Sequence, residues 1–405
     1  MNTPAQSSKS IPESKQNSTK TRFQSGNVII IGLSHLLHDI YSSFLAPILP
    51  LLIEKLGISL TAAGLLGIIQ RIPSLFNPFV GIMAENMKVR YFVIFAPALT
   101  TISMSLIGLA PGYVILAIFL FVAGFSSTLY HVPSPVMIKR VSGDKLGKGM
   151  SYFMVGGELA RTLGPLIIVA AVTHWGLEGT YKLIPFGILA SIILFFRLRK
   201  IDLREEFTKS NEKPEYYKTF KKFLPTFAIL GFIIFFRGAM KSALTLYLAV
   251  YLTEIKGNTL WFAATALSVL QLAGVLGTFS SGTISDRIGR RTTMVIITTI
   301  TPVLMWLFLN AQGVLTFPVL IITGFFLVAP GPVMLAIIQE LKTKHLAFVN
   351  GIYMTITFGF NSLMLLLVGV FSDHFGMETT YIISGIAAGL SIPFAFMLPR
   401  KRKQG

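Results

Sequence analysis

Long uninterrupted apolar runs dominate the chain and recur about every 30 residues from Asn27 onward. A helix that spans a bilayer needs roughly 20 apolar residues at ~1.5 Å rise each. Runs of this length predict twelve spanning helices, over residues 27–53, 60–85, 91–110, 113–138, 150–174, 180–197, 223–253, 258–284, 292–311, 315–339, 346–372 and 378–398. A transmembrane β-barrel would instead show alternating segments of ~10 residues, and continuous blocks such as Ile184–Phe196 exclude it. The pattern predicts an all-α integral membrane protein.

Polar segments divide these runs into two sets of six. Residues 1–26 hold almost no bulky apolar side chains and lack the apolar core of a signal peptide, so we expect a disordered tail. A charged, helix-prone segment at 198–222 links an N-terminal bundle (27–197) to a C-terminal bundle (223–399). Residues 400–405 form a short basic tail.

Composition supports the membrane interpretation. Of the 405 residues, 53% are hydrophobic and 13% charged, with a mean hydropathy of +0.69, whereas soluble domains are ~45–50% apolar and ~25% charged. There is no cysteine. These values exclude a water-soluble enzyme and a disulfide-stapled secreted module.

The net charge of +18 suggests a nucleic-acid partner, but the placement of the charges excludes one. Of the 35 Lys and Arg residues, 28 fall in the termini and in the loops after even-numbered runs, and only Lys55, Lys182 and Lys256 fall in the opposite loops. Basic loops face the cytoplasm, so both termini are predicted to be cytoplasmic. Attraction to anionic lipid is the physical consequence, and the cluster Arg400–Lys403 is interpreted as a headgroup anchor.

The two halves repeat one another. The segment Gly282-Thr-Ile-Ser-Asp286-Arg287-Ile-Gly289-Arg290-Arg291 follows the eighth run, and a degenerate copy, Gly81-Ile-Met-Ala-Glu85-Asn86-Met-Lys88-Val-Arg90, follows the second. Gly81 to Gly282 and Glu85 to Asp286 are both offsets of 201 residues. Parallel six-helix halves of this kind characterise a major class of secondary transporter.

This repeated loop is a candidate gate. Asp286 is expected at the cytoplasmic end of its helix, with arginines that can hold carboxylates or helix-end carbonyls of the adjoining half in one facing state. The alternative is a basic topology signal without a gating role. In the fifth run, Gly156, Gly157, Gly164 and Pro165 would let the helix pack closely or bend.

Away from the ends of the apolar runs lie six charged residues that are firmly intramembrane: Asp39, Arg71, Glu158, Arg161, Arg237 and Lys241. Each costs about 2.5–3.5 kcal/mol at a helix centre, so they must face protein or water. Their sum is +2 with histidines neutral, which favours an anionic solute such as a phosphonate, phosphate ester or carboxylate.

Asp39 is the candidate proton-coupling residue. His35 and His38 precede it by four and three residues and share its helix face. Burial raises a carboxyl pKa, a neighbouring cation lowers it, and histidine titrates near neutrality. The alternative is a static hydrogen-bond cluster that ties this helix to a neighbour.

The remaining buried charges are candidate solute ligands. Arg237 and Lys241 are spaced i, i+4, which is unfavourable unless an anion lies near them. Arg237 could also pair with Asp39 across the halves. Glu158 and Arg161 are spaced i, i+3, so they form a mutual salt bridge or serve function, with Glu158 as a second coupling candidate.

Two further positions remain open. Arg71 has no local partner and either reaches Glu158 or faces the cavity. His131, beside Pro133 and Pro135, is a buried structural histidine or a ligand.

The Gly-x-x-x-Asp-Arg-x-Gly-Arg-Arg loop resembles the signature of the major facilitator superfamily. More narrowly, the chain resembles the fosmidomycin-resistance branch of that superfamily. The matching stretches are Leu33–Asp39, Gly124–His131, Val155–Gly157, Leu163–Pro165, Gln339-Glu340 and Ser372–His374.

The resemblance implies twelve helices in two bundles, with the first, fourth, seventh and tenth around a central cavity. It also implies ion-coupled alternating access, usually proton-driven drug export in this branch. The chain departs from the branch at His131-Val132-Pro133-Ser134, where His-Pro-Glu is usual, and at Arg71, Glu158 and Arg161, which are usually neutral. Because these changes fall where a solute would bind, they argue against fosmidomycin itself.

Three functions are therefore carried forward. The first is a proton-coupled exporter of a small, anionic organic solute or drug; the second is a proton-coupled importer of an organic anion; the third is a receptor or scaffold that does not transport. No metal-ligand spacing, phosphate-cradling loop or nucleophile elbow stands out, so no metal, cofactor or enzymatic activity is expected. Energy would come from a proton gradient, and we expect a monomer in a prokaryotic plasma membrane.

Overall fold

The computed structural model describes residues 23–77, 80, 90–199, 216–343 and 346–399. The expected tails at 1–22 and 400–405, and most of the linker, lie outside the described residues. Within them the chain is helical and contains no strand. Among the described residues, eleven helical segments are long and apolar enough to cross a membrane. In place of the second expected span the structure has the shorter apolar helix Leu60–Phe76, and most of the residues that follow it, 78–79 and 81–89, are not described.

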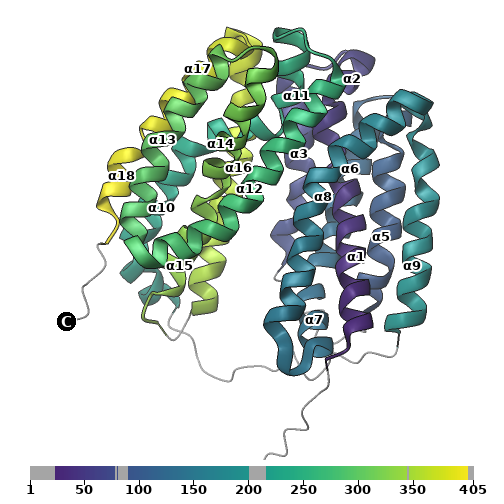
Figure 1. The fold of residues 1–405 in the computed structure, drawn as a ribbon, viewed down its shortest axis with the longest axis horizontal. Helices are drawn as coiled ribbons and strands as arrows, with labels where there is room; N and C mark the ends of the chain where they lie inside the picture. Colours follow the sequence, from purple (N-terminus) through teal and green to yellow (C-terminus); the bar gives the residue numbers. More distant parts are fainter. Residues whose placement is uncertain (1–22, 78–79, 81–89, 200–215, 344–345, 400–405) are drawn as a thin grey trace, which may run out of the picture.

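The helices form two bundles that lie side by side (Figure 1). The N-terminal bundle contains α1 (Ser25–Ser42), α2 (Leu45–Leu56), α3 (Leu60–Arg71), α5 (Arg90–Ser105), α6 (Tyr113–His131), α7 (Ser134–Ser142), α8 (Leu146–Trp175) and α9 (Ile184–Leu198). The C-terminal bundle contains α10 (Tyr216–Thr245), α11 (Leu248–Val250), α12 (Leu260–Ile288), α13 (Arg290–Asn310), α14 (Thr316–Val328), α15 (Pro330–Gln339), α16 (Leu346–Phe375), α17 (Met377–Gly389) and α18 (Ile392–Met397). Short 3-10 or π turns occupy Ile72–Phe76, Ile107–Leu109, Gly143–Lys145, Glu178–Leu183, Tyr251–Ile255 and Gly313–Leu315.

Two expected boundaries differ from the structure. Helix α1 begins at Ser25, inside the expected tail, and α10 begins at Tyr216, inside the expected linker. Both extensions are polar, and polar residues can continue a helix outside the apolar layer. The first expected run is interrupted after Ser42, where Ser43 and Phe44 separate α1 from α2.

The internal repeat is visible in the turns. In each half a glycine with positive φ, Gly57 or Gly257, is followed by a residue whose hydroxyl caps the next helix, Ser59 for α3 or Thr259 for α12. In each half, a lysine side chain also donates a hydrogen bond to a backbone carbonyl oxygen at the end of a neighbouring helical segment. The Lys55 ammonium donates to Gly108 O at 2.8 Å, and Lys256 donates to Leu309 O at 2.7 Å. Both donors and both acceptors are 201 residues apart.

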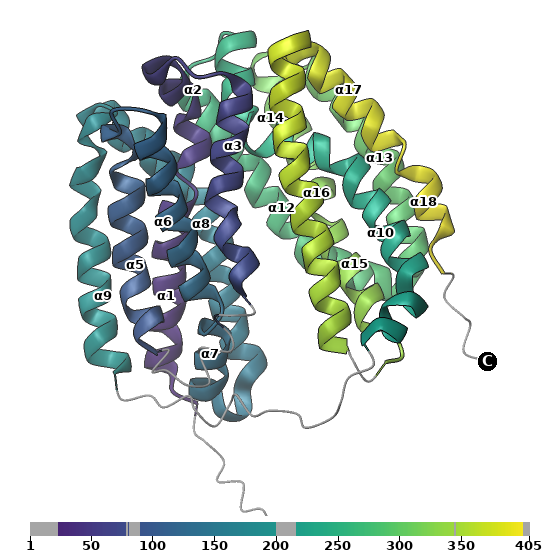
Figure 2. The same ribbon diagram turned by 180° about the vertical axis from the view of Figure 1, so that it is seen from behind.

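The bundles meet near one end and diverge toward the other. Helix α3 packs against α16, and α8 packs against α12. The contacts gather at the end that holds α2 and α11, whereas the bundles separate toward the end where α1 begins and α9 ends (Figure 2). The charge distribution predicts that this separated end faces the cytoplasm.

Glycines set the helix spacing inside the C-terminal bundle. A Cβ on Gly277 of α12 would collide with the backbone oxygen of Phe325, and a Cβ on Gly324 of α14 would collide with that of Leu270. Helices α12 and α14 therefore touch through their backbones, as small residues permit in membrane bundles.

This packing predicts that Gly277→Ala destabilises the protein by about 1–3 kcal/mol, because the opposing atoms are backbone and cannot rotate away. The measurement is thermal unfolding in detergent. Gly359→Ala is the matched control, since Gly359 lies within α16 and a Cβ there meets nothing within 4 Å. Equal unfolding temperatures for the two variants would show that the close approach contributes nothing.

Candidate functional site

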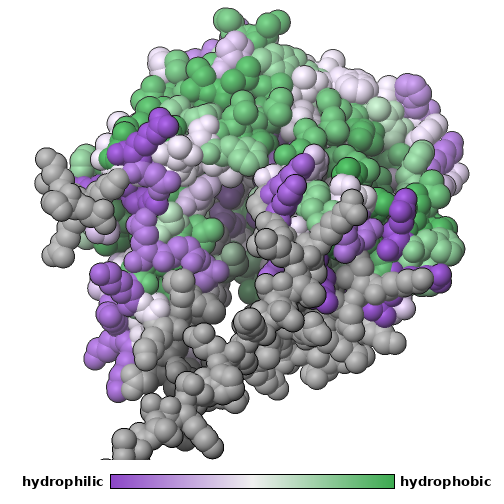
Figure 3. Space-filling view, turned by 60° about the horizontal axis from the view of Figure 1, so that its bottom comes forward, coloured by the Kyte–Doolittle hydropathy of each residue, from purple (hydrophilic) through white to green (hydrophobic). Residues whose placement is uncertain are grey.

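A cavity of about 270 Å³ lies between the two bundles. Its wall contains Asp39, Ser42, Ser43, Leu45, Ala46, Gly67, Gln70, Arg71, Ser127, His131, Arg161, Pro165, Thr245, Leu246, Leu267, Gln271 and Leu365. Seen from the separated end, the surface is recessed between the bundles, and hydrophilic side chains gather around the opening (Figure 3). The wall comes from α1, α2, α3, α6, α8, α10, α12 and α16. The tenth expected span contributes no described residue to it, although the resemblance implies that it should.

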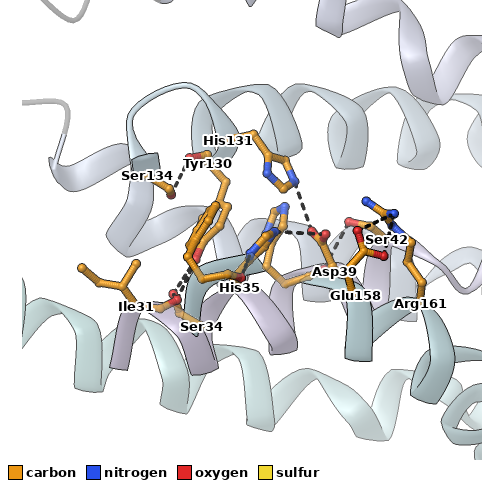
Figure 4. A network of polar contacts seen from close by, with 12 residues as sticks. Ile31, Ser34, His35, Asp39, Ser42, Tyr130, His131, Ser134, Glu158 and Arg161 are labelled. Atoms are coloured by element: carbon orange, nitrogen blue, oxygen red, sulfur yellow. Dashed lines mark hydrogen bonds and ion pairs between the residues drawn. The ribbon is translucent and has the colours of Figure 1, made fainter. Parts of the chain in front are cut away.

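Asp39 sits at the centre of a buried polar cluster in this wall. Its Oδ2 lies 3.2 Å from His35 Nε2, one turn earlier on α1, and its Oδ1 lies 3.1 Å from His131 Nε2 on α6. His35 Nδ1 lies 2.7 Å from the backbone oxygen of Phe153 on α8. The cluster therefore joins three helices of one bundle (Figure 4).

The hydrogen-bond geometry places a proton in this cluster. The Phe153 carbonyl can only accept, so His35 Nδ1 carries hydrogen and donates to it. In a neutral His35 ring, Nε2 would then present a lone pair to the Asp39 carboxylate, and two acceptors would face each other at 3.2 Å. One proton between His35 Nε2 and Asp39 Oδ2, bonded to either atom, resolves the conflict.

His131 is the member that the sequence did not assign to this cluster. It is 92 residues from Asp39, and only the packing of α6 on α1 brings the two together. Its side chain is 38% exposed, whereas those of His35 and Asp39 are 7% and 10% exposed. The donor atoms of the three side chains lie within 4.8 Å of one another, which suits a single shared cation. Asp39 and His131 both line the cavity, and His131 is the more exposed of the two.

His38 does not contact the Asp39 carboxylate. It is fully buried and stacks on Tyr130 with ring centroids 4.4 Å apart and an interplanar angle of 14°. Neither ring nitrogen has a hydrogen-bond partner among the described residues. Helical spacing predicted that His38 shares a face of α1 with Asp39. The ring of His38 instead packs on Tyr130.

Positive side chains converge next to the cluster. Arg71, at the end of α3, and Arg161, on α8, both line the cavity. Lys241 lies on α10 one turn before the lining residue Thr245. The positive charges of Arg71, Arg161 and Arg237 are near enough to repel its ammonium group.

Only part of this charge is neutralised. Arg161 Nη1 lies 3.1 Å from Glu158 Oε2, so the expected mutual salt bridge is present, and it lies beside Asp39 (Figure 4). Arg71 has no ion-pair partner among the described residues, and Glu158 pairs with Arg161 rather than with it. The cavity therefore presents Arg71 as a cation available to an anion.

Arg237 lies elsewhere than expected. It is buried inside the C-terminal bundle, where Nη1 donates to Thr301 Oγ1 at 2.7 Å and Nη2 donates to Phe326 O at 3.1 Å. In this structure Arg237 does not pair with Asp39, and it does not line the cavity. Packing of α10 against the rest of its own bundle directs this side chain inward, which sequence spacing could not show.

The loop between α12 and α13 braces a single bundle. Gly289 has φ +95° and turns the chain, so that Arg290 Nη2 lies 2.6 Å from Asp286 Oδ1 and 2.7 Å from Glu340 Oε1 at the end of α15. These contacts lie within the C-terminal half. The sequence predicted that the arginines hold carboxylates or helix-end carbonyls of the adjoining half in one facing state only, and that contact stays a prediction. Arg287 is exposed, Arg291 stacks over Phe396, and Gly282 O accepts from Arg290. The repeated residues Gly81 and Glu85 lie outside the described residues.

The glycines of the fifth expected span serve close packing. Helix α8 continues unbroken through Pro165. A Cβ on Gly156 would collide with Gly32 O of α1, and one on Gly164 would collide with Ser43. Gly157 lies directly against the His35 ring. The small residues of α8 therefore allow the backbone of α1 to pack closely against α8, with His35 directly beside Gly157.

Two amides in the cavity wall were missed in the sequence analysis. Gln70 of α3 donates to Ser42 O at 3.0 Å, and Gln271 of α12 faces the cavity from the other bundle. They are 201 residues apart, the same offset that relates the two loops. That offset was the signal that could have identified them as a pair.

Comparisons with known proteins agree with this architecture. A sequence profile described as Major Facilitator Superfamily matches residues 31–359 and 282–405. The chain belongs to the major facilitator superfamily, and it is a multi-pass membrane transporter rather than an enzyme.

Similar proteins include named transporters. The chain is 25% identical over 392 residues to the fosmidomycin resistance protein of Escherichia coli (strain K12), covering 95% of this chain and 96% of that protein. It is 24% identical over 387 residues to the uncharacterized MFS-type transporter YfnC of Bacillus subtilis (strain 168), covering 93% of each.

Solved structures share the fold. A bacterial homolog of the human lysosomal transporter Spinster, in an inward-facing and unoccupied conformation, superposes with a TM-score of 0.78 at 14% identity, covering 93% of this chain and 96% of that one. A D-xylose–proton symporter superposes with a TM-score of 0.73 at 12% identity, covering 94% and 99%.

Proposed function

We propose that this transporter exports a small anionic organic solute in exchange for protons, by alternating access. The observation that supports this most strongly is the contact of 3.2 Å between His35 Nε2 and Asp39 Oδ2, beside a cavity whose wall contains Asp39, Arg71 and Arg161. The E. coli relative is named for drug resistance, which accords with export. The transporter would work as a monomer in a prokaryotic plasma membrane, with both termini cytoplasmic and basic loops near anionic lipid.

Exchange requires that solute and proton exclude each other. His131 is half-exposed in the cavity wall and bonds to Asp39. A solute that takes the His131 Nε2 hydrogen bond removes it from Asp39 and changes the proton affinity of the whole cluster. Binding of the solute at the arginines and release of the proton would then be linked in a single cavity.

Glu158 is a second coupling candidate. Its carboxylate lies beside Asp39 and holds Arg161, so protonation of Glu158 would free that arginine for the solute. The positive charges of Lys241 and Arg161 would strengthen the electrostatic potential that attracts an anion to the cavity. In the facing state seen here, the Asp286–Arg290 loop would keep the C-terminal bundle rigid while the bundles rock.

A proton-coupled importer of an organic anion is the second candidate function. One observation favours it: Arg71 has no ion-pair partner among the residues described, so the cavity is positive, and a proton bound at Asp39 makes it more so. An anion and a proton would then bind together and move in the same direction. A receptor or scaffold that does not transport is the third candidate.

Flux into proteoliposomes separates the three functions. Candidate solutes come from drug-susceptibility profiling of a deletion strain and from comparison of its exported metabolites. For proton exchange we expect the solute to accumulate when the lumen is more acidic than the bath. Accumulation only when the bath is more acidic would indicate import, and binding without flux under either gradient would indicate a receptor. A chelator in both compartments tests whether the cation is a metal ion instead of a proton.

A further inference from the structure

Asp373 makes a polar contact between the two bundles that the proposed function has not used. It lies near the end of α16, within the Ser372–His374 stretch. Its carboxylate accepts from the backbone nitrogens of Leu60 and Thr61 at 2.9 and 2.8 Å, and from Thr61 Oγ1 at 2.5 Å. These partners belong to the first turn of α3, so a residue of the C-terminal bundle caps a helix of the N-terminal bundle.

The chemistry of this contact favours a charged carboxylate. The first N–H groups of a helix have no partner within the helix, and they carry the positive end of its dipole. Ser59 satisfies the Ala62 nitrogen, and Asp373 satisfies the two before it. Hydrogen bonds to an ionised acceptor are about twice as strong as neutral ones.

The surrounding seam is closed by direct backbone contact. A Cβ on Gly369 would lie 2.6 Å from Leu60 O, and a Cβ on Gly64 would lie 2.7 Å from Leu365 O. The Tyr247 hydroxyl lies between the same two carbonyl oxygens, at 3.1 Å from Leu60 O and 2.9 Å from Leu365 O. Gly67 of α3 and Leu365 of α16 also line the cavity, as does Leu246, which directly precedes Tyr247. The seam between α3 and α16 therefore closes this end of the cavity.

At the second seam between the bundles, where α8 packs against α12, the described residues include no equivalent carboxylate. Helix α12, which packs against α8, is capped by its own Thr259. The residue 201 positions before Asp373 is Val172 on α8, which cannot accept a hydrogen bond through its side chain. The contact made by Asp373 is thus specific to the α3–α16 seam.

We infer that Asp373 is the latch that holds the cavity closed at the end where α2 and α11 lie, and that it must release the first turn of α3 each time the cavity opens there. This inference rests on the alternating access that we propose, and it adds the residue that sets the balance between the two facing states. Asp373 is a positioning residue, since it touches neither the cavity nor the proton cluster.

The chain contains no cysteine, so the native sequence serves directly as the background for spin labels. One label pair, Tyr181→Cys with Val314→Cys, reports the latched end, and a second, Lys145→Cys with Lys342→Cys, reports the opposite end. All four positions are exposed. Electron–electron distance measurements on the full chain in nanodiscs, without added solute, give the populations of the facing states.

We expect Asp373→Ala to lengthen the distance at the latched end and shorten it at the opposite end, with the ratio of closed to open changed by about tenfold or more. Thr61→Val, which removes one of the three contacts, should shift the same ratio in the same direction by less. Glu378→Gln is the matched control, since it removes an exposed carboxylate from the first turn of α17 at the same end and should shift nothing.

Unchanged distances in Asp373→Ala, or a shift no larger than that of Glu378→Gln, would overturn the latch. Loss of both distance distributions would indicate unfolding, and Thr61→Val, which leaves the carboxylate in place, would then decide the question. These readouts need no proton gradient. The latch can therefore fail while proton exchange holds, and proton exchange can fail while the latch holds.

Discussion

Asp39→Asn should abolish solute accumulation driven by a pH gradient while solute exchange without a gradient continues. Asparagine has the shape of the aspartate, and its amide nitrogen can donate to His35 Nε2 while its oxygen accepts from His131 Nε2. The variant therefore reproduces the protonated cluster and should fold, but it cannot release the proton. We expect gradient-driven accumulation to fall to the level of protein-free vesicles, and exchange to lose its pH dependence.

Glu178→Gln is the control for Asp39→Asn. Glu178 is an exposed carboxylate that binds Lys55 at 2.8 Å, far from the cavity, so its loss should leave accumulation unchanged. Normal gradient-driven accumulation by Asp39→Asn would place proton coupling elsewhere. Glu158→Gln would then be the next variant to measure.

Arg71→Gln should weaken binding of the transported solute by about ten- to a hundredfold, if that solute is an anion. A hydrogen bond to a charged group contributes about 1.5–3 kcal/mol, and each 1.4 kcal/mol is tenfold in affinity. Arg161→Gln should have a smaller effect, because Glu158 already neutralises part of its charge. The measurement is the dissociation constant of the solute in detergent, with and without added salt.

Arg237→Gln provides the contrast. Its guanidinium binds Thr301 and Phe326 inside the C-terminal bundle, so we expect a lower unfolding temperature and an affinity close to that of the native protein. An unchanged affinity in both Arg71→Gln and Arg161→Gln would contradict the anionic solute. A large loss of affinity in Arg237→Gln alone would show that the solute reaches deeper into the C-terminal bundle than the cavity wall suggests.

The sequence predicted most of the fold because the bilayer imposes a simple requirement. Apolar runs long enough to cross it must be helices, and the runs at 180–197 and 378–398 appear as the segments Glu178–Leu198 and Met377–Met397. Helix ends were less predictable, as the early start of α10 shows, because polar turns extend beyond the apolar layer. The second span remains only partly described.

The site was predictable only where its residues are close in sequence. Helical spacing paired His35 with Asp39 and Glu158 with Arg161, and both contacts exist. It could not reveal the contact between His131 and Asp39, because the rotation of α6 about its axis is decided by packing. The same limit explains why Arg237 was expected near Asp39.

The equivalent hydrogen bonds of Lys55 and Lys256 show that the two halves have kept the same backbone arrangement. Their ionisable residues have diverged. At the same offset, Asp39 corresponds to Met240 and His35 to Phe236, so the first copy alone retains the ionisable pair. Among the residues that the structure describes, the carboxylate that caps a helix of the other bundle, Asp373, belongs to the second copy. The two halves of a repeated fold therefore contribute differently: the first supplies the acid–base pair, and the second supplies the carboxylate that holds the interface between the bundles closed.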